Sequence, residues 1–214
     1  MSQVPCWPAV ALAALLGPSL AAAQEAVHPE VATQRAEQLI AAGDVPGAVP
    51  LLERAGRNWY PDADLRLGLL YLDGEGVDRD VDRAVRHLQR AAEPNWMRML
   101  HKRGHPQAQH ALAGVYLSRE IGPFDPKAAV RLHEAAARSG HEASQLALAR
   151  LYASGEGTDV DRVEAFRWAA IARRSGDDAI RSDAADLARS LRASLDPADA
   201  RRIEREAAAF ESRS

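Results

Sequence analysis

Hydrophobic and small residues recur at helical spacing in this chain, and one pattern of them occurs three times. The clearest copy consists of Leu67-Gly68, Tyr71, Gly74-x-Gly76-Val77, Asp80, Ala84, Leu88 and Ala91-Ala92. The other copies begin at Leu112-Ala113 and at Leu148-Ala149. The repeat tyrosines Tyr71, Tyr116 and Tyr152 are 45 and 36 residues apart, a period that stacked pairs of helices produce. The pattern therefore predicts a helical repeat array.

Each copy predicts two antiparallel helices joined by a loop. The predicted pairs are 62–72 with 81–92, 106–118 with 126–139, and 142–154 with 162–174. Small residues are expected where the helices of a pair cross, at Gly68, Ala113 and Ala149 on the first helices and at Ala84, Ala128 and Ala165 on the second. The repeat tyrosines are expected to be buried between the helices of one pair. Counted from Tyr116 to Ala128, the middle loop is one residue shorter than that of the first unit.

Weaker helical patterns flank the three copies. Residues 24–60 predict a linker and an N-terminal helix pair, 29–42 and 46–57, in which Pro50 implies a later start or a kink. Residues 177–214 predict two charged helices, 178–194 and 198–210, that cap the array. The repeat units themselves occupy 61–93, 104–140 and 141–176.

Composition supports an all-α fold and narrows the function. Hydrophobic residues make up 47% of the chain but aromatic residues only 5%, and windows rich in Ala, Leu, Arg and Glu favour helix. The net charge is −3, with acidic and basic residues interspersed. No basic stripe is present, so nucleic acid is not a predicted partner.

The first residues predict an export signal. An apolar run extends from Ala9 to Leu16, Gly17-Pro18 ends it, and Ala21-Ala22-Ala23 precedes Gln24 as a small-residue cleavage site. The run is shorter than the ~20 residues a membrane span needs, although the segment before it carries no Lys or Arg. Cleavage would remove Cys6, which is the single cysteine. We expect a periplasmic or secreted protein without disulfides or a stable membrane span.

The recurring Leu-Gly, Tyr, Gly-x-Gly-Val, Asp, Ala and Ala-Ala positions resemble the Sel-one-like repeat (SLR) family, over about 61–176. The N-terminal helix pair resembles the related tetratricopeptide repeats. The resemblance implies a right-handed α-solenoid whose concave surface binds a protein or peptide, often as an adaptor in bacterial envelope or signalling assemblies. Repeat folds serve many roles, so this step does not identify the partner.

Residues that could carry chemistry lack the required arrangements. His101, His105 and His110 are close in sequence, but Gly104 and Pro106 interrupt any shared helix, so no metal site is predicted. His133-Glu134 and His141-Glu142 lack the second histidine of a zinc protease helix, and no Ser precedes a Lys by three positions. The paired glycines at 74/76 and 155/157 lack the Lys and Ser/Thr of a phosphate loop. We predict no catalytic residue and no cofactor.

An insertion at 93–103 separates the first two units. It contains Trp96 together with Pro94, Met97, Met99 and Leu100. These residues either pack as an extra helical turn or form an exposed anchor for a partner. The sequence leaves both interpretations open.

The resemblance to tetratricopeptide arrays also implies ligand-facing positions, which lie nine, six and two residues before each repeat tyrosine. In this sequence they are Asp62, Leu65 and Leu69, then Gln107, His110 and Gly114, then Ala143, Leu146 and Arg150. The leucines would supply apolar contact, and the polar side chains could bond an extended peptide. Alternatively the leucines are buried between neighbouring helices, or the C-terminal helices fill the groove.

The sequence therefore favours an exported, non-enzymatic scaffold. A second hypothesis is an exported hydrolase or regulator of cell-wall (peptidoglycan or β-lactam) chemistry. Exported SLR proteins linked to β-lactam binding are paired through cysteines, however, and the chain after residue 23 has none. A third is a cytoplasmic adaptor, if the first 23 residues stay attached.

We predict cleavage after Ala23 when the chain is produced in a bacterial host, because small residues stand at the end of the apolar run. N-terminal sequencing of the mature protein should begin at Gln24. A product that begins at Met1 or Ser2 would contradict export.

Overall fold

The computed structural model describes residues 28–94 and 103–210, which form ten α-helices and no strand. The helices are α2 (Pro29–Ala41), α3 (Val45–Arg57), α4 (Pro61–Asp73), α5 (Val81–Ala92), α6 (Pro106–Leu117), α7 (Pro126–Arg138), α8 (Glu142–Ser154), α9 (Arg162–Ala172), α10 (Asp178–Arg192) and α11 (Pro197–Phe210). Their bounds lie within two residues of those predicted. The predicted signal, the end of the chain and most of the insertion, with Trp96, lie outside the described residues.

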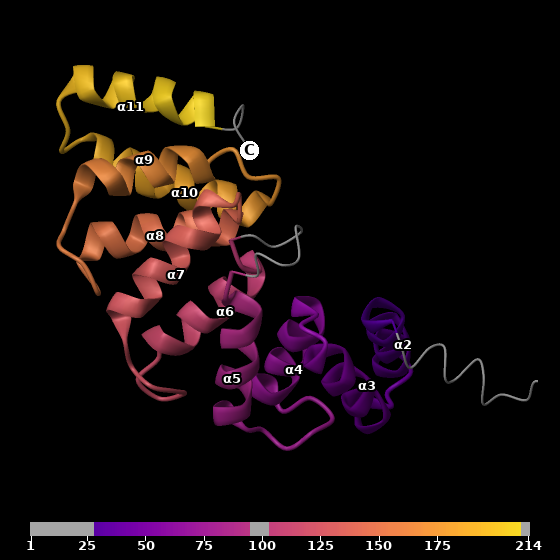
Figure 1. The fold of residues 1–214 in the computed structure, drawn as a ribbon. Helices are drawn as coiled ribbons and strands as arrows, with labels where there is room; N and C mark the ends of the chain where they lie inside the picture. The colour runs from indigo at the N-terminus through magenta and orange to yellow at the C-terminus, as the bar shows by residue number, and fades with distance from the viewer. Residues whose placement is uncertain (1–27, 95–102, 211–214) are drawn as a thin grey trace, which may run out of the picture.

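The helices stack as a solenoid. Each helix from α2 to α9 packs on the helix that follows it in sequence, and α11 packs on α9. Figure 1 shows the array continuing from α2 at one end to α11 at the other. A unit of two helices buries its apolar face only against its neighbours. The predicted all-α solenoid is confirmed.

An aspartate closes the hairpin of each repeat. The backbone N–H groups of Asp80, Asp125 and Asp161 donate to the carbonyls of Tyr71, Tyr116 and Tyr152 at 2.9, 3.0 and 2.9 Å. Each aspartate side chain accepts a hydrogen bond from the first turn of the second helix, at Arg83, at Ala128, and at Val163 and Glu164. Such caps satisfy amide groups that have no partner within the helix.

This common spacing corrects the predicted middle loop. Asp125 follows Tyr116 by the same nine residues that separate Asp80 from Tyr71. Of the two adjacent alanines in the first turn of α7, Ala129 is fully buried, at 0% exposure, whereas Ala128 is only partly buried. The predicted crossing residue Ala128 is therefore wrong by one position, and the middle loop is not shorter than that of the first unit.

The repeat tyrosines differ in their surroundings. Tyr71 is buried, as predicted. Tyr116 and Tyr152 are only partly buried, and their hydroxyls reach the preceding unit: Gln89 donates to Tyr116 Oη at 2.8 Å, and Tyr152 Oη donates to Glu134 at 2.7 Å. The prediction of burial within one pair is wrong for these two, because their hydroxyls tie successive units together.

The second helix of the N-terminal pair, α3, begins before Pro50 and not after it. Helix α3 starts at Val45, where Asp44 accepts a hydrogen bond from the Gly47 N–H at 2.9 Å. The helix continues through Pro50. The expectation of a later start was therefore wrong, and the proline occupies a helix interior at the cost of one backbone hydrogen bond.

The C-terminal end encloses one helix. Helix α9 packs against α8, α10 and α11, and its residues from Trp168 to Ala172 are all buried. The Trp168 ring meets the Phe210 ring of α11 edge to face at 5.9 Å. Figure 1 shows α11 lying over α9 at the end of the array. A helix covered on so many sides needs apolar residues around most of its circumference, and α9 has them.

The glycine at position 68 should tolerate no side chain. A Cβ there would lie 2.6 Å from Cγ of the fully buried Leu88 and 3.3 Å from the Ala84 carbonyl. We expect Gly68→Ala to lower the free energy of unfolding by about 1 kcal/mol or more. The matched control is Gly114→Ala in α6, where a Cβ would meet nothing within 4 Å. This substitution should raise the free energy of unfolding by roughly 0.5–1 kcal/mol. Denaturant unfolding measures both, and equal effects would contradict the close crossing.

Candidate functional site

The first helices of the three repeats share a stripe of exposed and partly exposed positions. It follows positions nine, five and two residues before the repeat tyrosine and two residues after it, and no residue in it is fully buried. The stripe, which we call the first-helix stripe, consists of Asp62, Arg66, Leu69 and Asp73, then Gln107, Ala111, Gly114 and Ser118, then Ala143, Ala147, Arg150 and Ser154. This spacing keeps all four positions on one side of a helix.

The predicted position six residues before each tyrosine is not part of this stripe. Leu65 and Leu146 are 8% and 5% exposed, and each belongs to a cluster that includes residues of the next first helix, α6 or α10. The third residue at this position, His110, is partly buried. Leu65 and Leu146 are therefore buried between neighbouring helices, which was the alternative left open by the sequence. Their side chains are not available to a ligand.

Several other predicted residues bridge successive first helices. Asp62 meets His105 Nε2 at 3.2 Å, and Arg150 Nη2 donates to Asp183 of α10 at 2.7 Å. Leu69 is partly buried. Gln107 is exposed and makes no side-chain hydrogen bond within the described residues. Helix α10 thus extends the row of first helices beyond α8 without burying Arg150, which remains exposed.

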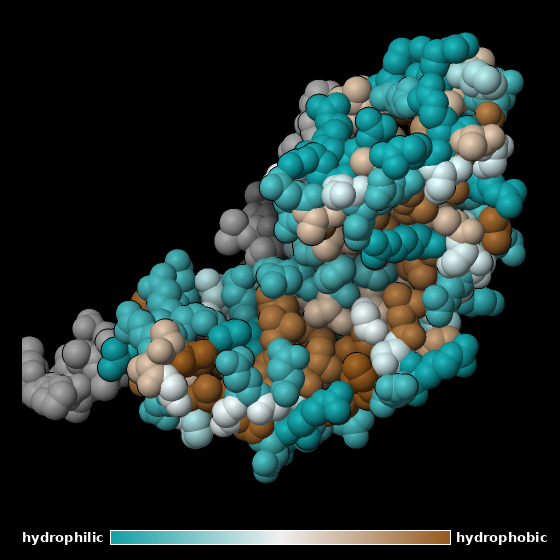
Figure 2. Space-filling view, turned by 180° about the vertical axis from the view of Figure 1, so that it is seen from behind, coloured by the Kyte–Doolittle hydropathy of each residue, from teal (hydrophilic) through white to brown (hydrophobic). Residues whose placement is uncertain are grey.

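Sequence reasoning missed the position five residues before each tyrosine. Arg66, Ala111 and Ala147 occupy it, and each is partly exposed. Four stripe positions on α6 and α8 carry only alanine or glycine: Ala111, Gly114, Ala143 and Ala147. Their side chains project little above these two helices. Figure 2 shows hydrophobic residues gathered in the middle of the molecule in this view, with hydrophilic residues prevailing over the C-terminal end.

A cluster of histidines joins the second and third repeats beneath this surface. The Nδ1 atoms of His110, His133 and His141 lie 3.0, 3.3 and 3.0 Å from one oxygen, Ser144 Oγ. The Ser144 backbone N–H donates to His141 Nδ1 at 3.2 Å, which makes that nitrogen an acceptor. A hydroxyl donates once and accepts twice. The consistent arrangement has Ser144 Oγ donating to His141 and accepting from His110 and His133.

All three imidazoles favour the neutral form. Burial lowers the pKa of His133 to about 3, with the neighbouring histidines adding to the effect. Burial also lowers the pKa of His141 to about 4 and that of His110 below its ordinary value. Protonating His141 would remove the acceptor that caps α8. The cluster is therefore a neutral hydrogen-bonded joint between two repeats.

This cluster is not arranged for catalysis. Ser144 is 0% exposed and His133 is 2% exposed, so no substrate carbonyl can reach the hydroxyl oxygen. The three nitrogens converge on that hydroxyl and not on an open position. In the described part of the chain, no group of three or more His, Cys, Asp or Glu side chains could hold a metal ion.

A cavity of about 730 Å³ lies beside the loop between α4 and α5. Gly74 and Gly76, with φ of 73° and 69°, line this cavity. The acidic residue Asp78 also lines it. Its cations are engaged, since Arg79 Nε donates to the Leu72 carbonyl and Arg83 pairs with Asp80 at 3.2 Å. Acidic walls and paired arginines do not suit a phosphate.

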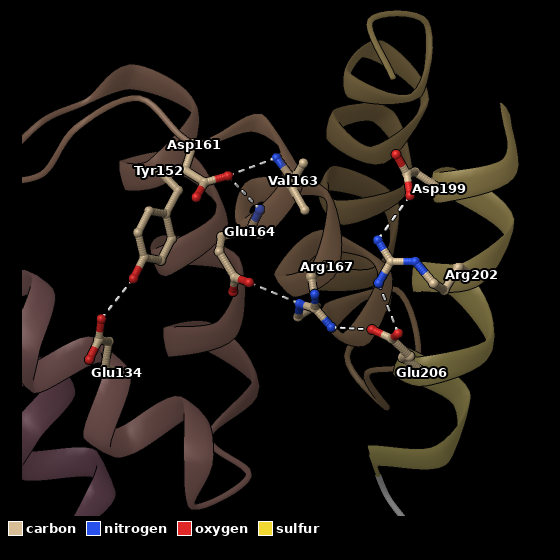
Figure 3. A network of polar contacts seen from close by, with 9 residues as sticks. All are labelled: Glu134, Tyr152, Asp161, Val163, Glu164, Arg167, Asp199, Arg202 and Glu206. Carbon is tan, nitrogen blue, oxygen red and sulfur yellow. Dashed lines mark hydrogen bonds and ion pairs between the residues drawn. The ribbon is translucent and has the colours of Figure 1, made fainter. Parts of the chain in front are cut away.

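Polar contacts fasten the C-terminal helix to the last repeat. Arg167 of α9 donates to Glu164 at 3.0 Å and pairs with Glu206 of α11, which also accepts from Arg202 at 3.1 Å. Figure 3 shows this chain of contacts beside the Asp161 cap and the Tyr152–Glu134 bond. These groups hold helices together and leave no reactive side chain aimed at an open site. Among the described helices, none has the length and apolar character to cross a membrane.

The stacked helix pairs with one common exposed stripe define an α-solenoid repeat protein. The sequence model of the Sel1 repeat matches residues 61–93, 106–141 and 143–177. The chain therefore belongs to the Sel1 repeat family, which confirms the resemblance seen in its sequence. No match was found among curated proteins.

Two solved structures are similar in fold. A Sel1 repeat protein from Oxalobacter formigenes superposes with a TM-score of 0.67 at 21% identity, over 91% of this chain and 76% of that one. The protective antigen c5321, present in uropathogenic Escherichia coli strains and displaying an SLR fold, gives 0.48 at 18% identity, over 88% of this chain and 47% of that one. Sel1 repeat proteins generally act as protein-interaction scaffolds, and the fold is typically non-enzymatic.

The histidine cluster predicts loss of stability in mild acid. Unfolded histidine has a pKa of about 6.5, whereas His133 in the fold has a pKa of about 3. Below pH ~6.5 the unfolded chain binds a proton at His133 that the folded chain does not bind. The free energy of unfolding therefore decreases as the pH is lowered, by up to about 1.4 kcal/mol per pH unit for His133.

Denaturant unfolding between about pH 7 and pH 5 should show this slope. His133→Asn should reduce the slope whatever it does to absolute stability. A free energy of unfolding that stays constant over this range would show that the imidazoles titrate normally.

Proposed function

We propose that this chain is an exported, non-enzymatic scaffold that binds an extended segment of a partner protein along its first-helix stripe. The single observation that carries the proposal is the repetition on α4, α6 and α8 of the same positions, each of which is exposed or partly exposed. A surface that repeats with the helix pairs matches an extended ligand, which presents its own groups at intervals.

The residues of the stripe suit such a ligand. At Gly114 a Cβ would meet nothing within 4 Å, so a peptide backbone can approach the helix closely. Gln107 offers amide donors to peptide carbonyls, and Arg150, one nitrogen of which pairs with Asp183, retains further guanidinium donors for a carbonyl or carboxylate. Leu69 supplies partly exposed apolar surface in the first repeat. Small, polar and apolar positions together are typical of a peptide groove.

The non-enzymatic part of the proposal is supported by where the reactive side chains lie. Ser144, which the three histidines surround, is closed to solvent, and the glycine loop of the first repeat has acidic walls. The proposal of export rests on the apolar run from Ala9 to Leu16 and the small residues before Gln24.

The test is crosslinking and affinity capture from intact cells, followed by capture with variants once the partner is identified. Gln107→Ala combined with Arg150→Ala should weaken capture while changing the melting temperature little, because both side chains are exposed and exposed polar groups contribute little to stability. His110 is kept, since it bonds Ser144.

The matched control is Arg86→Ala combined with Arg131→Ala, which removes two exposed side chains from the second helices α5 and α7. It should capture the partner as the unaltered chain does. If the stripe variant captures the partner as well as the unaltered chain does, the partner binds elsewhere: on the second helices if the control variant loses capture, and on another surface such as the Trp96 insertion if it does not.

A further inference from the structure

A tryptophan occupies a turn position where the other repeat linkers use glycine. Gly104 and Gly140 stand two residues before α6 and α8, with φ of 82° and 87°. Trp59 stands two residues before α4, with φ of 57°, and is the one non-glycine residue with positive φ in the described part of the chain.

The linkers at Trp59 and Gly140 share one backbone conformation. Trp59 N donates to the Gly56 carbonyl at 2.9 Å and Tyr60 N to the Ala55 carbonyl at 3.3 Å. Gly140 N and His141 N make the same two bonds to Ala137 and Ala136 at 3.1 and 3.0 Å. A Cβ at Gly140 would meet nothing within 4 Å. The turn shared by Trp59 and Gly140 therefore directs a side chain outward, whereas a Cβ at Gly104 would meet the Ala92 carbonyl oxygen at 1.9 Å.

Trp59 is unfavourable by two separate measures. A bulky L residue in the left-handed region is strained, and such strain concentrates at functional positions. The side chain is also 62% exposed, more than any other large hydrophobic residue among those described. Most of the indole therefore lies in solvent, and a glycine would occupy this position without backbone strain.

The surroundings of Trp59 are basic. Arg54 and Arg57 lie in the last turn of α3, and neither forms an ion pair within the described residues. Arg90 of α5 reaches the same turn, where it donates to the Gly56 carbonyl. Arginine side chains bind carboxylates through paired hydrogen bonds.

The nearest acidic groups are already occupied. Asp64 is 2% exposed, and its carboxylate meets His87 at 2.9 Å and Arg90 at 3.3 Å. Asp62 pairs with His105, and Glu53 is partly buried. The exposed charge beside Trp59 is therefore positive.

We propose that Trp59, Arg54 and Arg57 form a docking point for an acidic peptide segment of a partner protein, separate from the first-helix stripe. The indole would take an apolar side chain of the segment, and the arginines its carboxylates. The overall net charge of −3 disfavours a broad anionic surface such as a membrane, which would meet a whole face of the molecule.

The test uses the full chain and a library of acidic octapeptides of Asp and Glu, each carrying one apolar residue, read by fluorescence anisotropy. At least one acidic peptide should bind, and its counterpart with Asn and Gln should not. Trp59→Gly and Arg57→Gln should each weaken binding by about tenfold. Trp59→Gly should melt no lower than the unaltered chain, because glycine adopts positive φ freely.

The matched control is Arg131→Gln, an exposed arginine on α7, which should leave peptide binding unchanged. The proposal is overturned if no acidic peptide binds, or if Trp59→Gly binds as well as the unaltered chain. It is also overturned if phosphatidylglycerol vesicles bind through Trp59 and peptides do not. Dimerisation that Trp59→Gly abolishes, without peptide binding, would assign the position to a second copy.

Discussion

The close approach of the two helices within each unit is the constraint on which the array depends. Gly68 leaves no room for a Cβ against Leu88, and Ala113 and Ala149 occupy the same position with 0% exposure. A larger residue there would separate the helices and misalign the apolar faces that meet the next unit. The hairpin bond from each cap aspartate to its tyrosine then fixes how the second helix returns.

Helix positions and the family could be predicted from the sequence because both follow from local spacing. Cap residues such as Asp80 and loop glycines such as Gly74 act within one hairpin. The choice between Ala128 and Ala129 failed because adjacent small residues differ only in direction around the helix. The same limit displaced the binding positions, since Leu65 and Arg66 are neighbours and only the stacking of α6 decides which is covered.

Contacts between units gave no signal in the sequence. His110, His133 and His141 have no shared spacing, and they meet at Ser144 only because α6, α7 and α8 stack. Trp59 follows Asn58 without any turn motif that predicts positive φ. Such features depend on the rotation between successive helix pairs, which a periodic pattern of apolar residues does not encode.

The enclosure of α9 makes the two ends of the array mechanically different. Helix α2 packs chiefly on α3, so the N-terminal pair can separate without exposing the core of the later repeats. Helices α8, α10 and α11 all pack on α9, so removing α9 would expose the apolar faces of all three together. A force applied to the two ends would therefore open the chain from the N-terminal side, one hairpin at a time, and leave the C-terminal block as the last cooperative piece.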